Sequence, residues 1–211
     1  MPEEKAKKVT YFAKKHTRCP VCGTTFFKEE MYTGGGRLMA GKLADDLRRI
    51  YEPSKKYGEL FPLIYFITVC PFCYYATYPG DFLKVSENGK DKIEKETEKR
   101  KKSIGLIFPS INFTEPRDLE EGLASFYLAV MCYEYFEKRF SPTIKQAICT
   151  IRSAWICNDL HRRFPGENYD YLEKLFYRKA RFFYNQAIEL EQNGKELLSG
   201  VKSCFSLPNV L

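Results

Sequence analysis

The sequence predicts an α+β fold in which a small β domain carrying paired cysteines precedes an all-α helical domain. Two pairs of the form Cys-Pro-x-Cys, Cys19 with Cys22 and Cys70 with Cys73, lie beside strand-like segments. Three long segments in the second half of the chain repeat apolar residues at helical spacing. A highly charged stretch, residues 84–102, separates the two parts and suggests where one domain ends.

The length and composition fit this division. With 211 residues, 44% of them apolar and 16% aromatic, the chain can bury a core of ordinary size and carry a smaller domain beside it. We therefore predict four segments: a basic N-terminal tail (1–18), a cysteine-bearing ribbon domain with a helical insertion (19–83), a charged linker or exposed helix (84–108), and a helical domain (109–211).

The ribbon domain is predicted to consist of short strands around the cysteine pairs. Residues 24–27, with two threonines and two phenylalanines, fit a strand, and the glycines at 34–36 mark a turn. Leucines and an isoleucine between 38 and 50 recur at near-helical spacing and predict an inserted helix. Residues 63–69 predict a buried strand that leads into the second cysteine pair, and residues 74–78 a strand that returns from it.

The helical domain is predicted to hold three long helices. They run from about 118 to 139, 143 to 163 and 169 to 192, with a short fourth helix after them. Because only two to five residues join consecutive helices, the helices should pack as antiparallel neighbours. Tetratricopeptide-like repeats have this geometry, but no clean 34-residue repeat is visible, and a plain bundle is the alternative.

The two cysteine pairs predict one structural zinc ion bound by Cys19, Cys22, Cys70 and Cys73. A Cys-x-x-Cys turn directs two thiolates at one point, and two such turns complete a tetrahedral shell. Gly23 follows the first pair and can adopt the positive φ such a turn requires, whereas Tyr74 stands at the equivalent place after the second pair. The 47 residues between the pairs add little closure cost, because that cost rises slowly with loop length.

Other interpretations of the cysteines are weaker. A redox pair of the thioredoxin kind needs one Cys-x-x-Cys motif between a strand and a helix, and here a strand-like segment follows the first pair. His16 lies three residues before Cys19 and is an alternative ligand, although it fits a surface position. The remaining cysteines are expected to pack as small apolar residues in the helical domain: Cys132, Cys149, Cys157 and Cys204.

No catalytic motif emerges. A shell of four thiolates leaves no open position for water, so the predicted zinc is not catalytic. The sequence contains two histidines and no Gly-x-Ser-x-Gly motif, and the glycines at 34–36 lack the Gly-Lys-Ser/Thr ending of a P-loop. An enzyme or a redox switch that uses the zinc thiolates is a third hypothesis, behind the two binding functions below.

The chain is expected to be cytoplasmic and to have no membrane partner. Its longest apolar stretch, residues 63–69, is too short to cross a bilayer, and its first residues lack the pattern of an export signal. A reducing compartment also favours metal binding over disulfides for paired Cys-x-x-Cys motifs.

Charge and aromatic residues suggest two kinds of partner. The net charge of +7 comes from residues 1–18, with an excess of four positive charges, and from residues 84–102, with an excess of three. Such segments are often only solvated, but they would also suit nucleic acid. The helices hold more aromatic residues than one packed face needs, so the surplus could line a groove for a protein or peptide partner. A non-enzymatic adaptor is the leading hypothesis and nucleic-acid binding is the alternative.

The order of these motifs resembles a known family. Cys19-Pro20-Val21-Cys22-Gly23 is followed by Pro62-Leu63-Ile64-Tyr65, by the segment from Val69 to Ala76 with the second cysteine pair, by Asp81-Phe82, and then by helices. This arrangement is similar to a bacterial family of uncharacterised proteins that joins a zinc ribbon to a tetratricopeptide-like region. The resemblance implies metal binding at the four cysteines and no established activity. Tyr74 departs from the expected glycine, and the chain ends at residues 207–211 where such proteins often continue.

Overall fold

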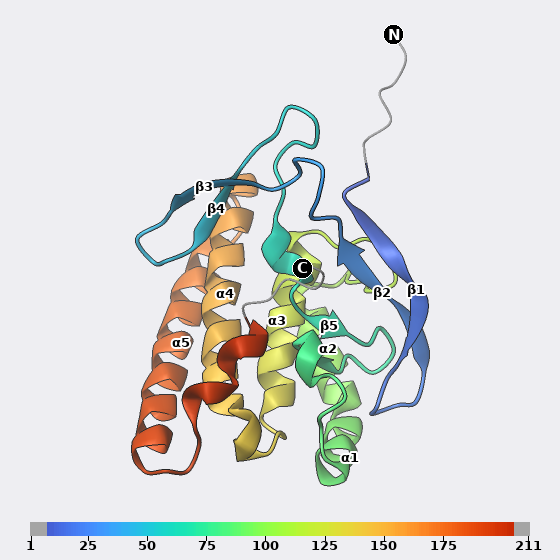
Figure 1. Cartoon of the computed structure of the whole chain (residues 1–211), viewed down its shortest axis with the longest axis vertical. Coiled ribbons are helices and arrows are strands. Elements are labelled where there is room, and N and C mark those ends of the chain that lie inside the picture. Colours follow the sequence, from blue (N-terminus) through green and yellow to red (C-terminus); the bar gives the residue numbers. More distant parts are fainter. Residues whose placement is uncertain (1–7, 205–211) are drawn as a thin grey trace.

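The computed structural model describes residues 8–204 and consists of a β part followed by a helical part (Figure 1). The predicted α+β class is confirmed. In chain order the elements are β1 (Thr10–Arg18), β2 (Thr25–Met31), β3 (Met39–Leu43), β4 (Arg49–Glu52), a 3₁₀ turn (Pro62–Tyr65), β5 (Thr68–Val69), β6 (Ala76–Thr77), a 3₁₀ turn (Pro79–Asp81), α1 (Glu87–Lys95), α2 (Thr97–Ile107), α3 (Leu119–Tyr133), a 3₁₀ turn (Lys138–Phe140), α4 (Pro142–Arg163), α5 (Tyr169–Gln192) and a 3₁₀ segment (Leu198–Cys204).

The strands form three separate antiparallel hairpins. β1 pairs with β2, β3 with β4, and β5 with β6, each pair as its own two-stranded sheet. The cysteine pairs lie in the turns of the first and third hairpins. Because a two-stranded hairpin is only marginally stable in water, each of these depends on what it packs against.

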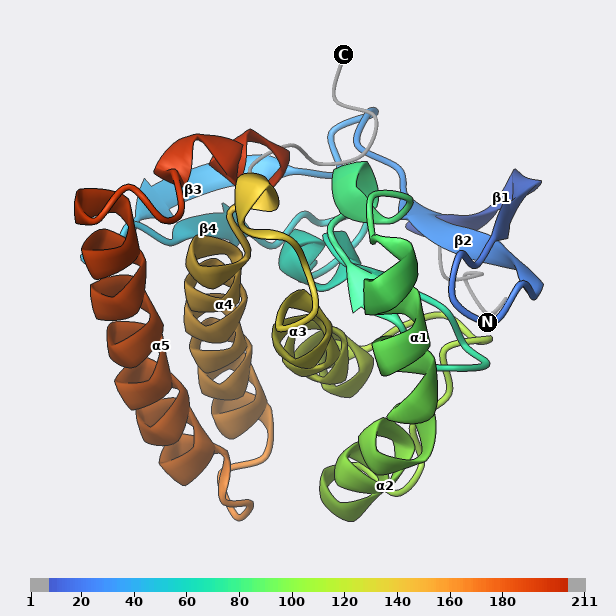
Figure 2. The ribbon, with the colours of Figure 1, turned by 90° about the horizontal axis from the view of Figure 1, so that it is seen from below.

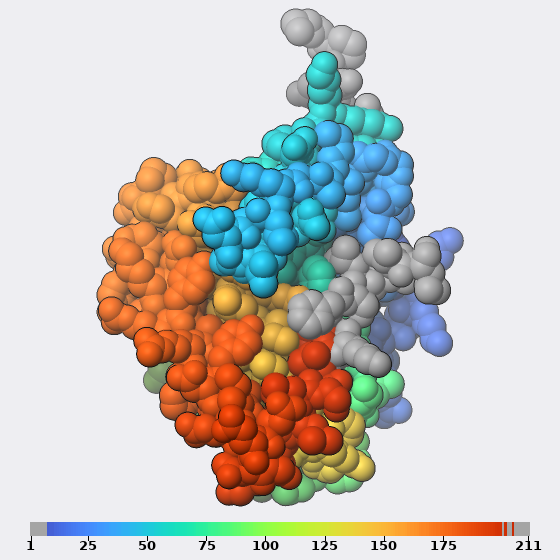
Figure 3. Space-filling view, turned by 60° about the vertical axis from the view of Figure 1, so that its left-hand side comes forward, coloured from blue at the N-terminus to red at the C-terminus, as the bar shows by residue number. Residues whose placement is uncertain are grey.

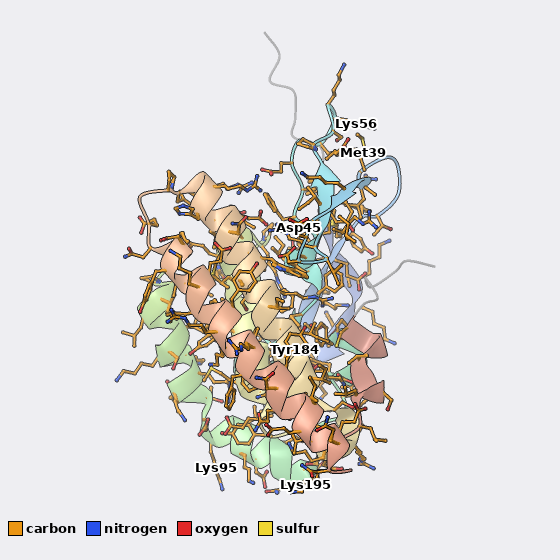
Figure 4. The ribbon with its side chains drawn as sticks, turned by 90° about the vertical axis from the view of Figure 1, so that its left-hand side faces the viewer. Met39, Asp45, Lys56, Lys95, Tyr184 and Lys195 are labelled. Atoms are coloured by element: carbon orange, nitrogen blue, oxygen red, sulfur yellow. The ribbon has the colours of Figure 1, made fainter. Side chains whose placement is uncertain are left out.

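Helices α3, α4 and α5 lie side by side, and α2 packs against the other side of α3 (Figure 2). The bounds of α4 and α5 agree with the predictions for residues 143–163 and 169–192. Met39 and Lys56 lie at one end of the molecule, and Lys95 and Lys195 lie at the other (Figure 4). The predicted ending of the chain at 207–211 lies outside the described residues.

Local signals account for the helix starts. Asp118 precedes α3 and forms a capping box, in which its carboxylate accepts from the backbone of Leu119 and Glu121 returns a bond to the Asp118 N–H. Pro142 begins α4 because its fixed φ suits a first helical position, where no N–H is needed. Such signals explain why the long helices were predictable.

One continuous apolar core joins the β part to the helices. β6 packs on α3, and Gly122 in α3 lets the Ile64 side chain approach so closely that an added Cβ would lie 2.4 Å from it. Arg117, directly before α3, donates to the carbonyl oxygens of Ile64 and Ile67 and pairs with the buried Glu29 of β2. The two parts are therefore packed as one unit along this boundary.

A buried polar network crosses the same boundary. Asp81, 1% exposed, accepts from the ammonium of Lys145 in α4 at 2.6 Å and from the hydroxyl of Tyr133 in α3 at 2.9 Å. Burial, and then the charge of Asp81, raise the pKa of Tyr133 well above its usual range, so its hydroxyl stays a donor. Tyr133 also accepts from the backbone N–H of Tyr78. The network ties the segment after the second cysteine pair to two helices.

Two sequence predictions in the N-terminal half are wrong. Residues 10–18, predicted as part of a basic tail, form β1. Lysines are tolerated there because much of the strand is exposed and because the first cysteine turn brings β2 alongside it. The predicted helix between 38 and 50 is instead the β3–β4 hairpin. Its spaced apolar residues do not form a core face, since Leu43 and Leu47 are 48% and 75% exposed.

Three further boundaries differ from prediction. The predicted strand at 63–69 is mostly a 3₁₀ turn, because Pro62 presets a helical φ, and only Thr68–Val69 pair as a strand. The first long helix ends at Tyr133 and not near residue 139. The charged residues 84–102 form most of two helices, in which Ile93, Arg100 and Ile104 are buried, so this segment is neither a plain linker nor a fully exposed helix.

The start of α4 depends on a carboxylate from beyond α5. Glu196, 2% exposed, accepts from the Thr143 backbone N–H at 2.6 Å and from the hydroxyl of Thr143 and the ammonium of Lys138. A negative charge at a helix N-terminus is favourable, and this one is shielded from water. We expect Glu196→Gln to lower the free energy of unfolding by about 2 kcal/mol.

Urea denaturation followed by circular dichroism measures this effect. The matched control is Glu189→Gln on the exposed side of α5, which should change stability by less than about 0.5 kcal/mol. Equal effects of the two substitutions would contradict the capping role of Glu196.

Candidate metal centre

The first cysteine turn joins β1 to β2. Gly23 N–H donates to the Cys19 carbonyl oxygen at 3.0 Å, and Cys19 N–H donates to the Thr24 carbonyl oxygen at 2.9 Å. These bonds fold the backbone around the two sulfurs. Gly23 has φ +72°, the left-handed conformation that glycine adopts without strain. The predicted role of this glycine is therefore confirmed.

The second turn, between β5 and β6, repeats the same bonds. Tyr74 N–H donates to the Cys70 carbonyl oxygen at 2.9 Å, and Cys70 N–H donates to the Tyr75 carbonyl oxygen at 2.8 Å. Tyr74 takes the position of Gly23 and has φ +56°, a conformation that is costly for a bulky residue. Its ring packs edge-on against Phe113, with ring centroids 5.4 Å apart, and this contact helps to hold the strained residue.

The two turns bring all four sulfurs together. The four Sγ atoms lie within 4.8 Å of one another, with Cys19 to Cys73 at 3.6 Å and Cys22 to Cys70 at 3.7 Å. These distances are far longer than the roughly 2.05 Å of a disulfide, and all four thiols are free. Three of the cysteines are buried and Cys22 is partly exposed. The cluster can hold a metal ion.

Crowding opposes full ionisation of the cluster in the absence of a cation. Contact with the Cys70 sulfur raises the pKa of Cys19 to about 12, and contacts with Cys19 and then Cys70 raise the pKa of Cys73. The same sharing of protons lowers the pKa of Cys70. One thiolate thus forms readily, whereas further thiolates need a positive charge among them, which a divalent metal ion supplies.

A buried arginine supports the second turn. Arg100 of α2 is 1% exposed, and its guanidinium donates to the Cys73 carbonyl oxygen at 2.9 Å and also to the Ile93 carbonyl oxygen. On the other side, the Ala76 N–H contacts the Cys132 sulfur at 3.4 Å. A fixed positive charge beside a cluster of thiolates orients and stabilises it. Nothing in the sequence marked Arg100, because it lies in the charged stretch among several other basic residues.

The other candidate residues lie apart from the cluster. The four-residue group that could hold a metal among the described residues does not include His16, whose exposed ring stacks on Phe27 with centroids 4.3 Å apart. The remaining cysteines are buried, as predicted: Cys132, Cys149, Cys157 and Cys204. Burial raises the pKa of Cys132 to about 11, which leaves this thiol protonated and unreactive at neutral pH.

The backbone at Gly23 gives a direct test of the turn geometry. Gly23→Ala forces a side chain into the left-handed region and should lower stability by about 1 kcal/mol. Gly166→Ala is the control, since no atom lies within 4 Å of its added Cβ and its φ is not positive. Thermal unfolding of both variants distinguishes them, and an equal response would mean that the first turn is not held in this conformation.

The described residues contain no helix long and apolar enough to cross a membrane. The family comparison is more informative about what the chain is. The model of a family described as uncharacterized proteins conserved in bacteria, DUF2225, matches residues 12–207, and this range includes all four cysteines. The chain belongs to the DUF2225 family.

A relative from Borreliella burgdorferi has similar sequence over nearly the whole DUF2225 chain. The two are 45% identical over 194 residues, which cover 92% of this chain and 69% of the relative, itself described as an uncharacterized protein. No solved structure matches the chain at a significant level. Family membership therefore leaves function to be inferred from the site itself.

Proposed function

We propose that the four cysteines hold one structural zinc ion and that the two cysteine turns form a zinc ribbon. The observation that carries this is the sulfur geometry. A Zn–S bond of about 2.3 Å places neighbouring sulfurs of a tetrahedron about 3.8 Å apart, and the two shortest distances here are 3.6 and 3.7 Å. Four thiolates also suit iron, so the metal's identity is part of the test.

A zinc ion bound in this way has a structural role. Its four thiolates fill the tetrahedral shell, so water or substrate has no position on the metal. The ion would instead connect the β1–β2 hairpin to the β5–β6 hairpin, which share no sheet. Binding energy then becomes folding energy for both hairpins, because the unfolded chain has no preformed site.

The function that this architecture supports best is a non-enzymatic adaptor that binds a protein or peptide partner through tetratricopeptide-like helices. Helix α5 supports this proposal, because several large apolar side chains on it are exposed in the described structure: Tyr171, Leu175, Tyr177, Phe182 and Ile188. Aromatic residues on a rigid helix are typical of the centres of protein interfaces.

Site-specific crosslinking tests the adaptor proposal. A photoreactive amino acid at Tyr171, 59% exposed, should capture a discrete partner in the native cell, whereas the same group at exposed Lys95 should not. The capture must be lost when Phe182 is changed to serine. Capture that is equal at both positions, or that survives Phe182→Ser, would contradict a binding role for α5.

Nucleic-acid binding is the second candidate, and the β1–β2 hairpin is the observation that favours it. Lys14, Lys15 and Arg18 are exposed on β1, close to the exposed rings of Phe12 and Phe27. Basic side chains beside aromatic rings suit single-stranded nucleic acid, which pairs charge on phosphates with stacking of bases.

Fluorescence anisotropy with short single-stranded DNA and RNA at several salt concentrations tests this candidate. Replacing Lys14 and Lys15 by glutamine should weaken binding and reduce the salt slope by about two, one for each lost phosphate contact. An unchanged slope would remove this hairpin from the account.

A further inference from the structure

A cavity of about 600 Å³ lies on the side of the molecule where the β3–β4 hairpin meets the helices (Figure 3). Its walls come from the hairpin, from residues 59–66 and from α4. The hairpin is fixed over α4 by Arg48, whose guanidinium donates to the Trp155 carbonyl oxygen at 3.0 Å and pairs with Asp159. This volume is typical of sites for small organic ligands. The cavity is separate from the cysteine cluster, because no cysteine lines it.

Most of the wall is apolar. Aliphatic and aromatic side chains surround the space, among them Ile50, Phe61, Leu63, Phe66 and Ile156. Trp155, the one tryptophan of the sequence, is also part of the lining. Such a wall favours a ligand with an apolar body, because burying that body removes its surface from water.

The charged residues of the lining are mainly positive. Five cationic side chains line the cavity against two carboxylates: Lys42, Arg48, Arg49, Arg152 and Arg162 against Glu59 and Asp159. Both carboxylates already have cationic partners. Asp159 pairs with Arg48 and with Arg162, the latter at 2.7 Å, and Glu59 pairs with Arg162 at 3.2 Å. The potential in the cavity therefore favours a negative ligand.

Arg152 places one of these charges deep in the wall. It is 6% exposed, its guanidinium carbon lies 4.8 Å from the centre of the Phe66 ring, and it donates to the Tyr78 hydroxyl at 3.0 Å. The rings hold the planar guanidinium in a fixed orientation. A guanidinium held in surroundings of low polarity is a strong anchor for a carboxylate or a phosphate, which it can bind through two parallel hydrogen bonds.

We propose that this cavity binds an organic anion in which a carboxylate or phosphate group is carried on an apolar chain or ring. The anionic group lies toward Arg152 and the apolar body lies along the hydrophobic walls. This site goes beyond the proposed structural zinc and partner surface and depends on neither, since its lining includes no metal ligand and no residue of α5.

Titration of the metal-loaded protein with four eight-carbon probes tests the proposal, with Trp155 fluorescence as the readout. Octanoate and octyl phosphate represent the two anionic groups, and 1-octanol and octyltrimethylammonium are the uncharged and cationic controls. We expect saturable binding of at least one anion, at least tenfold tighter than octanol, with no binding of the cation. The stronger anion identifies the preferred group.

Two substitutions of Arg side chains locate the anion. Arg152→Met removes the buried charge and should weaken anion binding at least tenfold while octanol binding changes little. Arg178→Met, at an exposed position on α5 away from the cavity, is the control and should leave all affinities unchanged. Equal weakening of octanol and octanoate by Arg152→Met would overturn the assignment of Arg152 as the anchor.

A second pair of variants keeps the test valid if Arg152→Met does not fold. Leu47 lines the cavity, is 75% exposed and has φ +65°, a conformation that asparagine and aspartate both tolerate. Leu47→Asp should weaken anion binding about threefold relative to Leu47→Asn at low salt, because the two differ only in charge. Equal anion affinities of this pair, equal binding of octanol and octanoate by the unchanged protein, or no response to any probe would overturn the proposal, even if the zinc ion is present.

Discussion

Cys70→Ser is expected to release the metal ion and to lower the free energy of unfolding by about 4 kcal/mol or more. Cys70 is fully buried and its sulfur lies 3.7 Å from that of Cys22, so its thiolate would connect the two cysteine turns through the ion. A serine hydroxyl is a poor ligand for zinc at neutral pH and leaves three thiolates that repel one another. The loss should therefore affect both hairpins and not only β5–β6.

Cys157→Ser provides the matched control for this prediction. Cys157 is also fully buried, but it lies in α4 outside the cluster. Its replacement should cost about 1–3 kcal/mol for burying a hydroxyl and leave the metal content unchanged. Metal analysis together with urea denaturation separates the two effects. If Cys70→Ser retained one metal ion per chain with full affinity, Cys70 would not be a ligand.

Asp81→Ala is expected to destabilise the protein by about 3–5 kcal/mol. The substitution leaves the ammonium of Lys145, 2% exposed, without the carboxylate that lies 2.6 Å away, and removes the acceptor of the Tyr133 hydroxyl. An ionised group that loses its buried partner is far more costly than the loss of a surface pair.

The opposite substitution should cost less. After Lys145→Met, Asp81 keeps the Tyr133 hydroxyl and the ammonium of Lys84 at 3.2 Å, which is partly exposed to water. Asp170→Ala, which breaks an exposed pair with Lys174 on α5, should change stability by less than about 1 kcal/mol. Urea denaturation at neutral pH measures all three variants. A larger loss for Lys145→Met than for Asp81→Ala would contradict the proposed dependence of Lys145 on Asp81.

The predictions from sequence succeeded where the determining interactions are local. Helices α4 and α5 were predictable because each repeats apolar residues over more than five turns and ends at a proline-glycine or asparagine-glycine signal. The cysteine turns were predictable because the spacing within each pair fixes the backbone bonds that Gly23 and Tyr74 make. These features need no knowledge of the rest of the fold.

Features that depend on distant residues were missed. The residues between 38 and 50 have near-helical spacing, but the turn at 44–47 and the contact of Arg48 with α4 make a hairpin the better solution. Asp81 and Lys145 are 64 residues apart, and Glu196 caps a helix that begins 54 positions earlier at Pro142. Arg100 supports the second cysteine turn from 27 residues away. No periodicity along the chain marks such pairs.

The anion cavity has the same origin. Its lining combines a hairpin, a loop segment and a helix that are separated by up to about a hundred residues, and the apolar residues of the hairpin gain their role only from this packing. The positive charges of the whole chain lie mainly in its basic segments, but those that line the cavity come from the β3–β4 region and α4. Net charge alone therefore gave no indication of an anion site.

X-ray absorption at the zinc edge, combined with metal analysis of the purified chain, tests the central claim most directly. The account predicts one zinc ion per chain with four sulfur neighbours at about 2.3 Å and no nitrogen or oxygen neighbour. A chain that folds stably without metal, a different resident metal, or zinc with an oxygen or nitrogen ligand would contradict a closed structural zinc site formed by Cys19, Cys22, Cys70 and Cys73.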